Sequence, residues 1–273
     1  HNIYGAFATP RFHIKYSINE KTILRASAGL GYRTARVIAE NNTMLASSRA
    51  LKIEEEPEQE QAFNAGINIT RYFDLMGREL RLSGEVYHTS FMNQVILDFD
   101  RDPQAIYIYN LDGRSYSNAY QVEASYELFE RMDMTVAFRY NDVKMNTDGT
   151  LQQKALTNRY KGLVTLSYAT NLRKWQFDFT TQFNGTSRVP GTESNPEQYR
   201  RSDKATAYTI INAQVSRFFR KWSVYVGGEN LTNYKQKDPI IAADRPFGRY
   251  FDSSMIWGPV SGVNIYAGIR FTL

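Results

Sequence analysis

The fold class follows from one stretch near the start of the chain, which reads Thr22-Ile-Leu-Arg-Ala-Ser-Ala-Gly-Leu-Gly-Tyr-Arg33. Every second residue from Leu24 to Tyr32 is apolar, whereas the residues between them are small or charged. Successive side chains of a β-strand point to opposite faces of a sheet. The stretch therefore predicts a strand with one apolar face and one polar face.

The same alternation recurs along the chain, and no helical periodicity is sustained. The longest unbroken apolar run, Ala105 to Tyr109, is too short for a transmembrane helix. We therefore predict an all-β fold built from about eleven antiparallel strands. These strands are expected at residues 11–18, 22–33, 61–73, 79–91, 115–128, 133–141, 158–169, 173–185, 206–219, 221–231 and 262–273.

The connections between these strands alternate between short and long, which places every long loop at the same end of an antiparallel sheet. Seven of the eight prolines lie in the long loops, where they remove no ladder hydrogen bond. This asymmetry is typical of an outer-membrane β-barrel. The long loops are expected at residues 34–60, 92–114, 142–157, 186–205 and 232–261.

Aromatic residues on the apolar face gather near both ends of the strands. Such rings settle at the two interfaces of a bilayer. A soluble sandwich could bury the same rings in its core, but it does not explain the loop asymmetry. The rings nearer the long loops are Tyr32, Tyr120, Tyr140 and Tyr160, and those nearer the short turns are Tyr16, Phe73, Tyr126, Tyr168, Trp175 and Trp222.

The polar face carries charged side chains of both signs in the middle of strands. Because such groups are costly in contact with lipid, this face is expected to line a wet lumen or to contact a polar plug. The residues assigned to the lumen or plug contact are Arg25, Arg33, Arg81, Glu85, Glu123, Arg139 and Asp178.

An odd number of strands does not fit a complete single-chain barrel, because bacterial barrels of this kind have even strand counts. Eleven strands are half of a 22-stranded barrel, whose lumen holds a plug. The chain opens at His1 without an initiator Met or a signal peptide, so we expect a mature fragment. The remaining strands are expected on a segment outside this sequence.

Several motifs resemble those of TonB-dependent outer-membrane receptors, in particular receptors from the Bacteroidetes. Residues 25–33 resemble the family's strand that ends in an aromatic residue and Arg, and residues 58–66 its acidic lead into the next strand. Gly227-Gly-Glu-Asn-Leu-Thr-Asn-Tyr234 resembles the penultimate-strand signature, and Ile256-Trp-Gly-Pro259 with Ile265-Tyr-Ala-Gly-Ile-Arg-Phe-Thr-Leu273 resembles the closing segment. The family's last strand usually ends in an aromatic residue, whereas this chain ends in Leu273.

The resemblance implies that residues 1–273 form the C-terminal half of such a barrel, with the plug and the N-terminal strands absent. It implies a multi-pass protein of the Gram-negative outer membrane that imports a scarce, bulky solute with energy from TonB. The implied solute is a metal chelate, a cobalamin-like or haem-like ligand, or an oligosaccharide. The implied partners are outer-membrane lipid, the missing barrel half and plug, TonB through that plug, a small-molecule or glycan ligand and a surface lipoprotein.

Two long loops have compositions suited to ligand binding. One combines acidic groups, an arginine and tyrosine rings, although its tyrosines could equally pack the loops together. The last loop could hold an anionic group by charge-assisted hydrogen bonds and stack a flat one. The candidate ligand-binding residues are Asp98, Asp100, Arg101, Tyr107, Tyr109, Arg245, Arg249, Tyr250 and Trp257, whereas the acidic run 54–60 reads as a solvated stretch.

Two other functions compete with the receptor hypothesis, namely a passive porin and an outer-membrane barrel hydrolase. His88 and Ser90 share one strand face, as in barrel phospholipases, but the sequence fixes no Asn or Asp partner for them. A barrel hydrolase should also close by itself. We therefore expect no enzyme activity and assign no catalytic residue.

Composition excludes several other classes of site. The chain has no Cys, so it has neither a disulfide framework nor a thiolate metal site. Its three His residues, His1, His13 and His88, lack the close spacing of zinc ligands, and we expect neither a metal nor a cofactor. The net charge of +5 is scattered, without the basic stripe that nucleic-acid binding needs.

Overall fold

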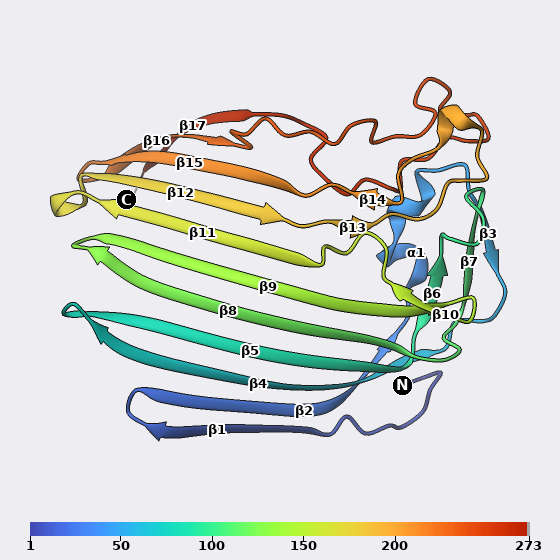
Figure 1. Ribbon diagram of the computed structural model, residues 1–273, viewed down its shortest axis with the longest axis horizontal. Coiled ribbons are helices and arrows are strands. Elements are labelled where there is room, and N and C mark those ends of the chain that lie inside the picture. The colour runs from blue at the N-terminus through green and yellow to red at the C-terminus, as the bar shows by residue number, and fades with distance from the viewer. Residues whose placement is uncertain (272–273) are drawn as a thin grey trace.

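The computed structural model describes residues 1–271 and is dominated by a 12-stranded antiparallel sheet (Figure 1). The predicted strands are confirmed, although Thr272 and Leu273 lie outside the described residues. Consecutive neighbours in the sheet are β1 (Arg11–Asn19), β2 (Thr22–Thr34), β4 (Gln59–Leu75), β5 (Arg78–Asn93), β8 (Ser115–Phe129), β9 (Met132–Thr147), β11 (Tyr160–Ala169), β12 (Trp175–Asn184), β15 (Tyr208–Phe218), β16 (Trp222–Glu229) and β17 (Asn264–Phe271).

The alternation of the sequence becomes two chemically different faces of this sheet. One row of cross-strand neighbours is polar and runs Arg25, Asn68, Glu85, Gln121, Arg139 and Lys161. The next row, on the opposite face, runs Ala26, Ile67, Val86, Tyr120, Tyr140 and Tyr160. We call these the inner face and the outer face.

The outer face is exposed instead of packed in a core. Val122 and Ile67 are 59% and 57% exposed, although both lie near the middle of their strands. The two clusters of buried apolar residues lie in the loops and not on the main sheet. This distribution contradicts a soluble sandwich and fits a surface that contacts lipid.

Tight turns connect strands at one end, and long loops gather at the other (Figure 1). The turn from β4 to β5 uses Met76 and Gly77, both with positive φ, as a right-twisted two-residue hairpin requires. The predicted loop 142–157 differs from expectation, because β9 continues to Thr147 and pairs with β10 (Thr150–Gln153). Asp148 and Gly149 form that turn and also have positive φ.

The long loops are folded into a compact layer, which we call the loop cap. Its largest unit is a three-stranded sheet in which β7 (Ala105–Asn110) lies between β3 (Ala50–Ile53) and β6 (Val95–Asp98). The β3 and β7 strands are parallel. The 3-10 helix η2 (Asn171–Arg173) does not belong to the cap, because it lies in a short turn outside it. The remaining cap elements are α1 (Val37–Glu40), η1 (Asn42–Leu45), β13 (Ser187–Arg188), η3 (Glu197–Tyr199) and β14 (Lys204–Ala205).

Each part of the cap has its own apolar core. Met44, Val95, Ile106 and Ile108 form one cluster, and Val189, Ala205, Ile241, Ala242 and Met255 form the other.

None of the helices in residues 1–271 is both long and apolar enough to cross a membrane.

Candidate ligand-binding cap and polar inner face

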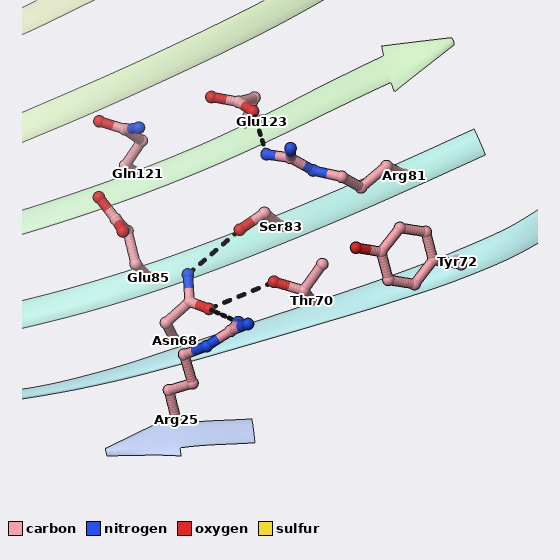
Figure 2. Close-up of a pocket in the computed structure, with 9 residues that line it drawn as sticks. All are labelled: Arg25, Asn68, Thr70, Tyr72, Arg81, Ser83, Glu85, Gln121 and Glu123. Atoms are coloured by element: carbon pink, nitrogen blue, oxygen red, sulfur yellow. Dashed lines mark hydrogen bonds and ion pairs between the residues drawn. The ribbon is translucent and has the colours of Figure 1, made fainter. Parts of the chain in front are cut away.

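A polar hollow of about 300 Å³ lies on the inner face and is formed by side chains of β2, β4, β5 and β8 (Figure 2). Asn68 is at its centre, because its amide accepts hydrogen bonds from Arg25 and Thr70 and donates one to Ser83 at 3.2 Å. Arg81 donates to Glu123 at 2.5 Å on the neighbouring strand. The hollow thus brings together Arg25, Arg81, Glu85 and Glu123, four of the seven residues assigned to the lumen.

The other three assigned lumen residues have separate partners along the inner face. Arg33 pairs with Glu60 and Glu40 where β2 meets the cap. Arg139 donates to Asn141 at 2.9 Å, and Asp178 accepts from Ser167 at 2.7 Å. The inner face therefore offers charges of both signs, and its contact with a plug stays a prediction.

In the loop cap, Asp98 is completely buried and organises the chain around it. Its carboxylate accepts hydrogen bonds from the backbone N–H groups of Asp100 and Arg101, at 2.8 and 3.2 Å. It also accepts one from the hydroxyl of Tyr109 at 3.2 Å. The carboxylate therefore satisfies three donors of its own loop, which supports the fold of the cap.

Tyr109 is half-buried in this network. Burial, together with the nearby Asp98 carboxylate, raises the pKa of the Tyr109 hydroxyl to about 12. The backbone N–H of Asp148 donates to the same hydroxyl at 3.2 Å and acts in the opposite direction. The hydroxyl thus stays neutral at physiological pH and joins the turn after β9 to the second loop.

Arg101 links several parts of the cap through its guanidinium group. The group lies 4.3 Å from the ring centroid of Tyr107 and 5.3 Å from that of Tyr109. It also donates to Glu54 at 2.9 Å. Glu60, at the other end of the acidic run, pairs with Arg33, so this run is more engaged in ion pairs than the sequence suggested.

Asp100 connects two loops through a bidentate ion pair. Both of its oxygens accept from the Arg188 guanidinium, at 2.6 and 2.9 Å. Residue composition could not assign Arg188 to this site, because its partner lies 88 positions away in the sequence.

The four candidates of the last loop divide into exposed and packed residues. Arg245 and Arg249 are exposed, whereas Tyr250 packs against Tyr199 with ring centroids 5.2 Å apart and ring planes tilted by 31°. Trp257 packs beside Tyr208 at 5.9 Å and, like Tyr250, contacts the second apolar cluster. Ligand contact by any of the nine loop candidates stays a prediction.

A buried ion pair that the sequence did not indicate fastens the first loop to the last. Arg49 Nε donates to Asp252 at 2.8 Å, and their side chains are 2% and 5% exposed. Arg49 also donates to the carbonyl of Phe99 at 3.1 Å. Since 203 residues separate Arg49 from Asp252, only the tertiary fold reveals the pair.

His88 and Ser90 lie on the outer face of β5, as the hydrolase alternative required. The strand register gives His88 a partner that sequence spacing did not reveal, because its Nδ1 lies 2.6 Å from Oδ1 of Asn118. Within residues 1–271, no hydrogen bond joins His88 to Ser90. No cluster of three or more potential metal ligands occurs in the same range.

The family model described as TonB dependent receptor-like, beta-barrel matches residues 1–231. The chain belongs to this family of TonB-dependent receptors. These are receptors and transporters of the outer membrane, not enzymes, so the hydrolase and porin alternatives are not favoured. No curated protein sequence matches the chain.

Solved TonB-dependent receptors share this fold. The FrpB iron transporter from Neisseria meningitidis has a TM-score of 0.63 and 12% identity, over 96% of this chain and 38% of its own. The copper transporter OprC has a TM-score of 0.65 and 13% identity, over 96% and 39%. The unliganded ferric citrate transporter FecA has a TM-score of 0.63 and 13% identity, over 96% and 37%.

This chain therefore spans about two fifths of the length of these solved receptors. At such low identity the likeness establishes the fold alone. The chain is a portion of a receptor barrel, and the ligands of these proteins are not assigned to it.

Proposed function

We propose that this chain supplies part of the wall, the capture loops and the plug-contacting lumen of a receptor that imports a scarce, bulky solute across the Gram-negative outer membrane. The candidate solutes are a metal chelate, a cobalamin-like or haem-like ligand, and an oligosaccharide. The supporting observation is the combination of an exposed apolar outer face, a charged inner face and a folded cap at one end of the sheet.

The missing partners in this proposal are the N-terminal barrel strands and the plug. Within residues 1–271, strands β1 and β17 each pair with one neighbour in the main sheet, so each has one free edge. Free strand edges are not tolerated in hydrocarbon, and eleven further strands would close a 22-stranded barrel. The plug would contact the inner face, and TonB would act through the plug.

Energised import is tested in cells that produce the full-length protein. We expect uptake of the cognate solute to require both this protein and TonB, because the plug must move under periplasmic force. Solute binding to the cells should persist without TonB. Equal uptake with and without TonB would overturn energised import and favour passive diffusion.

The role of the capture loops could be tested by deleting residues 98–107, but this change would disrupt the fold of the cap. That deletion would remove Asp98 and half of β7, the central strand of the cap sheet. Arg249→Ala instead removes an exposed cation that belongs to neither buried cluster and lies 5.8 Å from the ring centroid of Tyr250. We expect weaker solute binding with an unchanged unfolding temperature, whereas unchanged binding would remove Arg249 from the site.

A further inference from the structure

A second cavity lies where the loop cap meets the inner-face rim of the sheet. Its volume is about 390 Å³, within the usual range of small-molecule sites. Arg33 and Glu60 contribute to it from β2 and β4, and the rest of its wall comes mainly from the cap. The cavity therefore occupies the position at which a captured solute would leave the loops for the lumen.

One side of this cavity is apolar and held in place by packing. Val37, Leu97 and Phe99 line it and rest against the buried cluster around Met44. Leu156 and Pro190 add apolar surface from two further loops. A ligand that fits this wall gains free energy by removing apolar surface from water.

The charged groups that line the cavity balance one another. Arg33 pairs with Glu40 and Glu60, and Asp100 pairs with Arg188. Lys154 is the remaining charged lining residue, so three basic and three acidic groups give no net charge. A ligand with several negative charges would find no surplus of cations to offset its loss of hydration.

The same charged side chains can hydrogen-bond an uncharged polar ligand. The carboxylates of Glu40, Glu60 and Asp100 accept hydrogen bonds, and the three cations donate them. A ligand hydroxyl both donates and accepts, so it can bond to either kind of group. The wall thus combines an apolar surface with hydrogen-bonding groups of both kinds.

We infer that this cavity binds a neutral small molecule that joins an apolar group to hydroxyl or amide groups. The inference rests on the proposed function, because it names the class of solute that the capture loops would pass to the lumen. The apolar group contacts Leu97 and Phe99, and a hydroxyl or amide forms hydrogen bonds with the charged side chains of the wall. Polyanionic chelates are disfavoured by the balanced charge.

The test uses full-length protein in nanodiscs and 4-fluorophenyl β-D-glucoside, a neutral probe with one ring and several hydroxyls. Fluorine-19 NMR titration measures its binding, and 4-fluorophenyl β-D-glucuronide is the matched anionic probe. We expect the glucoside to bind at least about tenfold more tightly than the glucuronide. Unlabelled glucose, which lacks the apolar group, should not displace it at equal concentration.

Two variants locate this binding in the cavity. Ala155→Trp places a large side chain in the cavity, and we expect it to weaken glucoside binding at least about tenfold. Leu151→Trp is the matched control, because Leu151 is exposed on β10 and does not line the cavity.

Any of three results would overturn the inference. These are a glucoside that fails to bind, that binds no more tightly than the glucuronide, or that binds Ala155→Trp as tightly as wild type. Empty nanodiscs measure partitioning of the probe into lipid. Equilibrium binding requires no TonB, so this result is separate from the uptake assay. Loss of TonB dependence with intact glucoside binding would overturn energised import alone.

Discussion

At the scale of single residues, the buried pair of Arg49 and Asp252 shows how strongly the cap depends on contacts distant in sequence. Replacement of Asp252 by Asn leaves the Arg49 guanidinium buried without its counter-charge. Breaking a buried pair on one side costs about 3–5 kcal/mol. We expect Asp252→Asn to raise hydrogen exchange and protease cleavage in the cap around Arg49 and around Phe99, whose carbonyl accepts from Arg49.

A matched exposed pair provides the control for this change. Arg245 and Asp244 are 3.7 Å apart, with side chains 75% and 72% exposed. Exposed pairs contribute about 0–1 kcal/mol, so Asp244→Asn should leave cap exchange almost unchanged. Equal effects of the two substitutions would show that the buried pair does not fasten the cap.

Tyr109 makes the cap sensitive to alkaline pH. Its pKa is about 12 in the folded protein, against 10.0 for an ordinary tyrosine, so the unfolded loop loses this proton first. The stabilisation from neutral Tyr109 is therefore complete below pH 10 and is lost as the pH rises toward 12. Subtracting the ultraviolet titration of Tyr109→Phe from that of wild type isolates the ionisation of Tyr109. We expect this difference to rise near pH 12, and a rise near pH 10 would contradict the burial of Tyr109.

At the scale of elements, the Asp148-Gly149 turn determines how β10 returns against β9. Gly149 has φ +74°, and no atom lies within 4 Å of the place where a Cβ would stand. Gly149→Ala should therefore destabilise this turn by about 1 kcal/mol, because alanine is strained at a positive φ and not because its Cβ meets another atom. Faster hydrogen exchange in residues 144–153 would report it, and unchanged exchange would contradict the expected strain.

Gly84→Ala is the corresponding control in the main sheet. Gly84 has no positive φ, and a Cβ there would meet its nearest atom, of Ile69, at 3.8 Å. We expect this substitution to leave the exchange of β5 unchanged. A large effect would show that strand glycines are also held by close packing.

The sequence predicted those elements whose pattern is local. Residues 22–33 alternate because each side chain faces either lipid or lumen, so β2 could be read from its own residues. The parallel pairing of β3 with β7 could not, because it joins Ala50 to Ala105 across an intervening hairpin. In the same way, Asp98 could be assigned to a polar loop, but its burial depends on three donors supplied by the folded cap.

At the scale of the whole molecule, the two faces should respond in opposite ways to the same added charge. Gln121 and Val122 are consecutive in β8 and lie on the inner and outer face, respectively. Val122→Arg places a cation in lipid and should destabilise the barrel by about 2–4 kcal/mol. Gln121→Arg should have little effect on stability. Folding equilibria in lipid vesicles measure the free energy of unfolding of both variants. Equal destabilisation by the two substitutions would contradict the assignment of faces.

Photocrosslinking from β8 of the full-length protein in native outer membranes tests the central claim most directly. A photoreactive amino acid is placed at position 121 or 122, and the products are identified by mass spectrometry. The receptor architecture predicts that position 121 crosslinks to a plug segment of the same protein and position 122 to lipid alone. A lumen position that reacts only with water, with no protein crosslink, would contradict the plugged receptor and indicate an open pore.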